Sequence, residues 1–150
     1  MYRAREIARW FIAWANADDE AALTNLKLQK LLYYAQGTHF AVKGEPLFED
    51  EIQAWAHGPV IPDVYHCYKQ FGGSPVSDEE PFEWTVVDRE DAKILVLVWN
   101  TFGSKSAWKL REMTHQESPW LDHYRDGVPG ITIPKEDIAV FFKSNVAMPQ

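Results

Sequence analysis

The residue types best suited to chemistry gather first around a histidine-bearing corner, Trp55-Ala56-His57-Gly58-Pro59-Val60, with Tyr65 following a few residues later. Pro59 fixes its own φ and restricts the residue before it, and Gly58 is the residue that tolerates this restriction best. We expect His57 to lie at the end of a short strand, beside two aromatic side chains. This corner can serve as a purely structural turn, as a functional site, or as both.

A second concentration of polar and aromatic side chains runs from Trp108 to Trp120 and contains His115. One interpretation is a loop that presents Trp120 beside His115. The other is a helix end in which His115 interacts with the last carbonyls and Trp120 packs into the core. An enzyme built on His57, Tyr65 and His115 would need a concave pocket joining them and a histidine with a perturbed pKa.

Other routes to catalysis find little support in the sequence. Cys67 follows His66 directly, and neighbouring side chains on a helix point roughly 100° apart, so the two cannot form a hydrogen-bonded dyad there. A buried structural cysteine is the favoured interpretation. No two histidines have the short spacing that places both on one helical face, so we expect neither a metal site nor a cofactor. Motifs of nucleotide-binding loops, serine hydrolases and zinc proteases are missing. We therefore expect a protein that is not an enzyme.

Composition favours a protein partner. The formal net charge is −7 and the sequence pI is near 5.2, which argues against nucleic-acid binding because phosphate contacts need clustered Lys and Arg. Seven Trp, six Tyr and eight Phe exceed what a core of 150 residues needs, so some are expected at an interface. The chain has a single cysteine and no signal-peptide pattern, and both favour the cytoplasm. Its longest apolar run, Ile94–Trp99, is too short to span a bilayer, so we expect no membrane partner.

The hydrophobic patterning predicts one domain over residues 1–150, a mainly α, compact helical bundle with a small two-stranded β element. The clearest helix is capped by Thr24 and stopped by Gly44, and it is expected to be the spine of the core. Strands are expected at Glu51–Ala56 and Ile131–Ile133, paired with each other. The remaining expected helices are Tyr2–Ala17, one from Pro62 to Gly72-Gly73, one from Asp88 to about Phe102, Ser106–Met113 and Lys135–Ser144.

The central helix is expected to carry one apolar stripe at spacings of three and four. Lys27, Lys30 and Gln36 fall outside that stripe and should lie on another face of the helix. Trp84–Val87 is expected to be a short extended piece. The expected stripe consists of Leu28, Leu31, Leu32, Ala35, His39 and Val42.

Three blocks together carry a family resemblance. The first is the run from Leu26 to Gly37, LKLQKLLYYAQG; the second is Trp55-x-His57-Gly58-Pro59-Val60 with its following Tyr; the third is Leu110-x4-His115 through Pro119-Trp120. From about Tyr2 to Tyr124 the chain resembles the Panacea domain family of SocA-like antitoxins and phage-associated proteins. The resemblance implies an antitoxin that neutralises a cognate toxin by direct binding, the toxin being encoded in the adjacent gene.

The resemblance also implies which residues carry the family signature. They are Lys27, Gln29, Lys30, Tyr33, Tyr34, Trp55, His57, Gly58, Pro59, Val60, Tyr65, His115, Pro119 and Trp120. A scaffold that neutralises unrelated toxins should keep its framework and vary its contact surface, so the signature can mark the core as well as the contacts. The alternatives are an adaptor that delivers a bound protein to a protease and, less favoured, an enzyme using the His57, Tyr65 and His115 region. The sequence indicates neither the oligomeric state nor the toxin.

Overall fold

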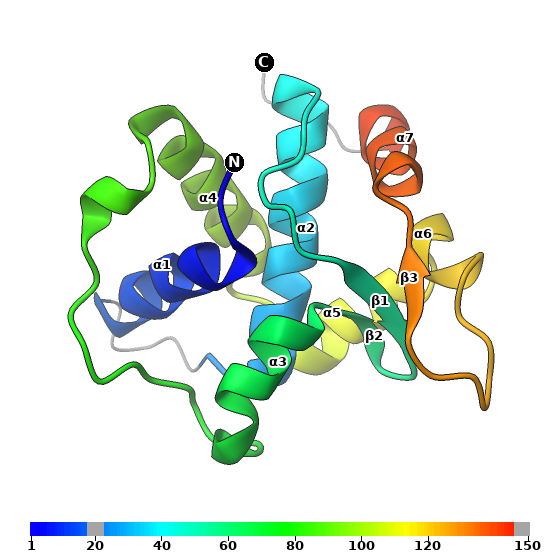
Figure 1. Cartoon of the computed structure of the whole chain (residues 1–150), viewed down its shortest axis with the longest axis horizontal. Coiled ribbons are helices and arrows are strands. Elements are labelled where there is room, and N and C mark those ends of the chain that lie inside the picture. Colours follow the sequence, from blue (N-terminus) through cyan, green and yellow to red (C-terminus); the bar gives the residue numbers. More distant parts are fainter. Residues whose placement is uncertain (18–22, 146–150) are drawn as a thin grey trace.

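The computed structural model describes residues 1–17 and 23–145, and it confirms a mainly α fold with a small β element (Figure 1). The helices are α1 Ala4–Ala17, α2 Asn25–Lys43, α3 Pro62–Tyr68, α4 Arg89–Phe102, α5 Ala107–Thr114, α6 Ser118–Leu121 and α7 Lys135–Asn145. The strands are β1 Ile52–Trp55, β2 Gly58–Val60 and β3 Ile131–Ile133, and two 3-10 turns are η1 Lys69–Phe71 and η2 Trp84–Val86.

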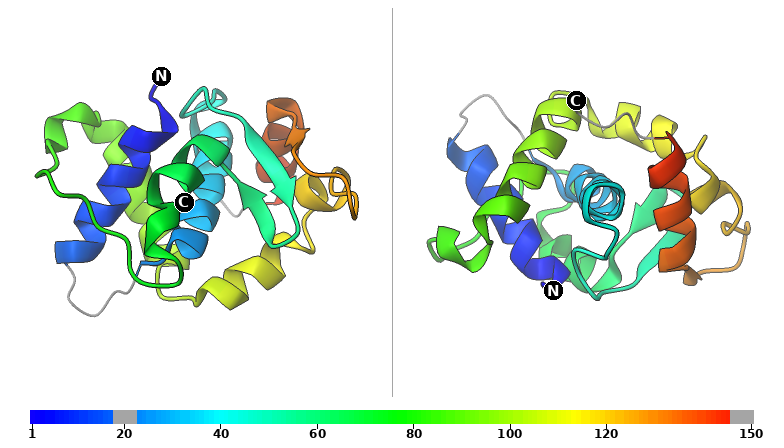
Figure 2. Two further views of the ribbon diagram at one scale, coloured as in Figure 1. Left: turned by 60° about the horizontal axis from the view of Figure 1, so that its bottom comes forward. Right: turned by 90° about the horizontal axis from the view of Figure 1, so that it is seen from above.

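Helix α2 is the spine of the molecule, as its capping residues predicted. The Thr24 hydroxyl accepts a hydrogen bond from the Lys27 backbone N–H at 3.3 Å and so begins the helix. Gly44 ends it in the left-handed region, at φ 75°, with its N–H donating to the Phe40 carbonyl. Seen from above, α2 is viewed almost end-on and the other elements surround it (Figure 2).

The expected apolar stripe does not separate buried from exposed residues of α2. Lys27, Lys30 and Gln36 are all buried, and Val42, placed on the expected stripe, is exposed instead. The helix contacts α1, α4, α5, α7 and β2, so it has no solvent face along most of its length. Its polar side chains bond backbone groups of those neighbours, which periodicity along one helix cannot reveal.

Gln36 illustrates this arrangement. Its amide nitrogen donates to the Phe48 carbonyl at 3.0 Å, and its amide oxygen accepts from the N–H groups of Leu47 and Phe48 at 2.7 and 3.2 Å. These three bonds fasten the segment that leads into the sheet against α2. A buried amide with its partners satisfied in this way specifies one arrangement of the two segments.

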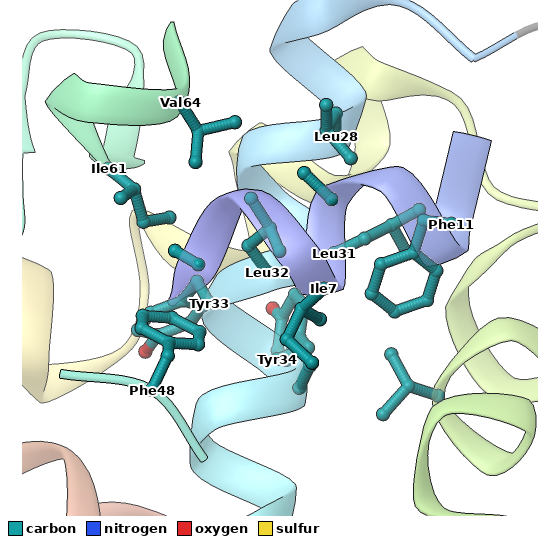
Figure 3. Close-up of a cluster of buried hydrophobic side chains, with 14 of the residues drawn as sticks. Ile7, Phe11, Leu28, Leu31, Leu32, Tyr33, Tyr34, Phe48, Ile61 and Val64 are labelled. Carbon is teal, nitrogen blue, oxygen red and sulfur yellow. The ribbon is translucent and has the colours of Figure 1, made fainter. Parts of the chain in front are cut away.

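The apolar core forms where α1 and α3 meet α2 (Figure 3). Ile7 and Phe11 of α1 face Leu31 and Leu32 of α2 across this cluster, and Val64 of α3 closes another side. Each of these side chains is fully buried.

The sheet has three strands in the order β2-β1-β3, one more than expected. The predicted pairing of β1 with the Ile131 segment is confirmed, with Ala54 opposite Ile131. The extra strand is β2, which folds back on β1 so that Trp55 lies opposite Gly58 and Ala54 opposite Pro59. An edge strand tolerates a proline because one side of its ladder is free.

Two smaller expectations are corrected by the structure. Trp84–Val86 is a 3-10 turn rather than an extended piece. Cys67 is half-buried rather than buried, since it packs at the margin of the core on α3. Among helices within residues 1–17 and 23–145, none combines the length and apolar character needed to cross a bilayer.

We predict that Gly37→Ala destabilises the fold by about 1–3 kcal/mol through overpacking. Gly37 lies inside α2, where a Cβ would overlap the ring of Phe142 from α7. Gly73→Ala is the matched control because a Cβ at Gly73 meets open space. Urea unfolding of both variants measures the effect, and a loss for Gly37→Ala no larger than that of the control would contradict the packing argument.

Candidate functional site

The family-signature residues of α2, the β-hairpin and the α5–α6 region converge on one point. The Lys30 ammonium donates to the Pro59 carbonyl at 3.1 Å, fully buried. Gly58 has φ 115°, and a Cβ there would lie 2.6 Å from Lys30 Cε and 2.9 Å from Thr114 Oγ1. Glycine is therefore required at position 58 for two reasons: the backbone conformation is one that other residues rarely adopt, and a Cβ would have no space.

Gln29 extends this junction toward α3. Its amide oxygen accepts from the Ile61 N–H at 2.9 Å, and its nitrogen donates to the Asn25 side chain at 2.9 Å. Asn25 in turn donates to the Tyr65 carbonyl at 3.1 Å. On the other side of α2, Lys27 donates to the Gly103 carbonyl after α4. These α2 signature residues hold the surrounding segments in place.

Tyr33 and Tyr34 both bond the carboxylate of Glu117, a residue outside the family signature. Their hydroxyls donate to Glu117 at 2.9 and 2.8 Å, one to each carboxylate oxygen. Burial raises the pKa of Glu117 to about 7, although the two tyrosine hydrogen bonds oppose the shift. The sequence offered no signal for this contact because more than 80 residues separate the partners.

Lys30 is the most unusual ionisable group of the framework. Burial, and secondarily the positive charge of Arg111, lower its pKa from 10.5 to about 7. Within residues 1–17 and 23–145, its one hydrogen-bond acceptor is a backbone carbonyl, and no carboxylate lies within ion-pair distance of it. A lysine so placed stabilises the hairpin by geometry rather than by ion pairing.

Four signature residues remain half-buried and reach the surface together: Trp55, His57, Tyr65 and His115. The rings of Trp55 and Tyr65 meet edge to face with centroids 5.0 Å apart, and His57 lies 6.4 Å from Tyr65. His115 stacks flat on the buried Trp120 at 3.9 Å. We call these four residues, together with Trp120 beneath His115, the aromatic–histidine surface.

Trp120 links the two halves of this surface. Its indole N–H donates to the Trp55 carbonyl at 2.7 Å, which ties α6 to the end of β1. The structure thus combines both interpretations of the His115 segment, since Trp120 packs inward and also lies beside His115. Pro119 is buried in the first turn of α6, a position that suits proline.

Both histidines of the surface have a lowered pKa, which favours the neutral imidazole. Burial lowers the pKa of His57 to about 4, and the charges of Lys30, Arg111 and His115 add to this effect. Burial also lowers the pKa of His115, again with contributions from Arg111 and Lys30. His57 Nδ1 and His115 Nε2 are buried and have no hydrogen-bond partner among the described residues.

The surroundings of His57, Tyr65 and His115 match the requirements of an enzyme only in part. The structure does bring His57, Tyr65 and His115 to one region with perturbed histidine pKa values, as an enzyme would require. However, hollows of about 470 and 1020 Å³ lie elsewhere and include none of the three. His115 is stacked on an aromatic ring, and within the described ranges no carboxylate orients either imidazole as a catalytic base requires. The same ranges contain no grouping of three metal-ligating side chains.

Comparison with known proteins places these residues in a family. Residues 28–121 match the family model described as Antitoxin SocA-like, Panacea domain. The chain belongs to this family. The matched stretch contains every signature residue named above except Lys27.

One curated relative of this Panacea domain is Antitoxin SocA of Caulobacter vibrioides (strain NA1000 / CB15N), which is 44% identical over 69 residues. The alignment covers 46% of this chain and 36% of the relative, so the chain spans about a third of the length of that protein. No solved structure matches the chain significantly.

We predict that Lys30→Met abolishes a rise in stability at alkaline pH. Between about pH 7 and pH 10.5 the unfolded chain retains the Lys30 proton that the folded chain has released. The unfolded state therefore binds more protons, and the free energy of unfolding contributed by this group increases with pH. Urea unfolding across this range measures it.

The control for this prediction is Lys93→Met, which removes an exposed lysine on α4. It should retain the alkaline rise shown by the wild type. Equal pH dependence in the two variants would show that Lys30 is not the group responsible.

Proposed function

We propose that this chain is an antitoxin that neutralises a cognate protein toxin by binding it directly, in the cytoplasm and without catalysis or a cofactor. The observation that carries the proposal is membership of the SocA-like antitoxin family across residues 28–121. The exposed side of the aromatic–histidine surface supports it, because half-buried Trp and Tyr side chains are typical of interface anchors.

The burial of the signature residues suggests a division of labour. Lys27, Gln29, Lys30, Tyr33 and Tyr34 are buried on α2, and each bonds another part of the chain. Gly58, Pro59 and Val60 are buried in β2. We assign these residues to the framework, and we assign toxin contact to the half-buried Trp55, His57, Tyr65 and His115.

Co-expression with the neighbouring reading frame tests the function itself. We expect the neighbouring product alone to arrest growth of the host cell, and co-expression of this chain to restore growth through complex formation. Growth curves together with co-purification of the two proteins provide the measurement. A harmless neighbour, or a neighbour that stays toxic beside a well-folded antitoxin, would refute the assignment for this gene pair.

Alanine substitutions on the aromatic–histidine surface test the assignment of contacts. We expect Trp55→Ala and Tyr65→Ala each to weaken toxin binding by about 2 kcal/mol, which is roughly 30-fold in Kd. Val140→Ala is the control, since Val140 is 66% exposed on α7. Calorimetric titration measures Kd, and a thermal melt confirms that each variant is folded. Unchanged affinity in both folded variants would move the contact face elsewhere.

A further inference from the structure

An arginine on α5 is held in place by an aromatic ring rather than by an acid. The Arg111 guanidinium lies over the Trp108 ring, 4.7 Å from its centroid. Trp108 is 61% exposed, and its indole N–H donates to Glu112 at 3.0 Å, which fixes the ring. Stacking of this kind orders the guanidinium while leaving its N–H groups free to donate.

These residues continue into the aromatic–histidine surface. Trp108, Arg111 and His115 are spaced three and four residues apart, so they follow one side of α5. His115 stacks on Trp120, and Trp120 stacks on Tyr124 at 4.8 Å. We use the name α5 ridge for this row, which begins on α5 and continues past its end: Trp108, Arg111, His115, Trp120 and Tyr124.

Charge distinguishes the α5 ridge from the rest of the molecule. Among the described residues, no carboxylate lies within ion-pair distance of the Arg111 guanidinium. Lys30, His57 and His115 all lie within electrostatic reach of Arg111, and none of them compensates its charge. The chain as a whole carries a net charge of −7, so Arg111 is a cation without an ion-pair partner on an acidic protein, even though the carboxylates of Glu112 and Asp126 accept hydrogen bonds from Trp108 and Tyr124 of the ridge.

We propose that the docking surface for the toxin extends from the aromatic–histidine surface along the α5 ridge, and that the toxin presents a carboxylate to Arg111 beside an apolar group packed on Trp108. This proposal rests on the antitoxin function proposed above. A carboxylate matches the forked geometry of the guanidinium, and it supplies the ion-pair partner that Arg111 lacks among the described residues.

The other exposed tryptophan offers a useful contrast. Trp84 is 47% exposed, but it packs edge to face against Trp10, Trp14 and Phe82. The cation next to that cluster, Arg9, is already engaged: it is 3.7 Å from the Asp78 carboxylate and donates to two backbone carbonyls. Of the two arginines that lie over an aromatic ring in the described part of the chain, Arg9 has an acid within ion-pair distance and Arg111 has none.

The test measures binding of the product of the neighbouring reading frame, in an inactivated form, to variants of the full chain. We expect Arg111→Glu to weaken Kd by about 100-fold or more, because it places two carboxylates together, and Trp108→Ala by about 10- to 30-fold. Arg111→Lys should lose about 10-fold, since an ammonium cannot form the forked contact. Trp84→Ala should stay within about threefold of the wild type.

The salt dependence of toxin binding distinguishes a direct charge contact by Arg111 from a merely structural role of that residue. Raising the NaCl concentration should weaken binding by the wild type and have less effect on Arg111→Gln. Thermal melts establish that each variant is folded.

The outcomes separate this inference from the proposed function. If the wild type forms no complex, the antitoxin proposal fails and the docking inference fails with it. If the wild type binds but folded Arg111→Glu and Trp108→Ala bind equally well, the docking inference alone is overturned. Loss of binding confined to Trp84→Ala would overturn the docking inference and place the toxin on the cluster formed by Trp84, Trp10, Trp14 and Phe82.

Discussion

A helix enclosed on every side must find partners for its polar side chains within the protein, and α2 meets this constraint with backbone groups from distant segments. Lys30 bonds the hairpin at Pro59, Gln29 bonds the entrance of α3 at Ile61, and Gln36 bonds the segment at Phe48. Leaving any one of these groups unpaired would cost about 1–3 kcal/mol. The positions of the hairpin and of α3 therefore depend on α2 directly, and the surface built on them depends on α2 in turn.

This dependence explains why the most recognisable residues of the family are spread over three distant blocks. Each block supplies one side of a single junction: Lys30 from α2, Gly58 from the hairpin and Thr114 from α5. The junction leaves room for little variation, whereas the rings of Trp55, His57, Tyr65 and His115 are only half-buried. A rigid base beneath aromatic anchors is the arrangement expected of a binding module, because preordered side chains lose little entropy on association.

The sequence predicted those features that local chemistry determines. Thr24 and Gly44 cap α2 as expected, Asp88 begins α4, and the Ile131 segment pairs with β1. Features that depend on distant contacts were missed. The burial of Lys30 and Gln36 requires neighbours that helical spacing does not encode, and β2 escaped notice because Gly58-Pro59 was interpreted as the end of a strand.

The same distinction applies to the site. The resemblance identified His57, His115 and Trp120, but it could not separate framework from surface, since burial is a property of the folded chain. Glu117 and Arg111 were missed as individual residues. Their significance comes from what surrounds them: Glu117 accepts hydrogen bonds from two tyrosine hydroxyls, and Arg111 lies over the ring of Trp108.

The contact between Gly37 and Phe142 has a consequence for synthesis of the protein. The side of α2 at Gly37 is covered by α7, about a hundred residues later in the chain. On the ribosome, α2 emerges long before its cover, so the nascent chain exposes this side until α7 has left the exit tunnel. Completion of the core is therefore a late event, and premature termination before α7 produces a chain whose central helix is open to proteases and chaperones.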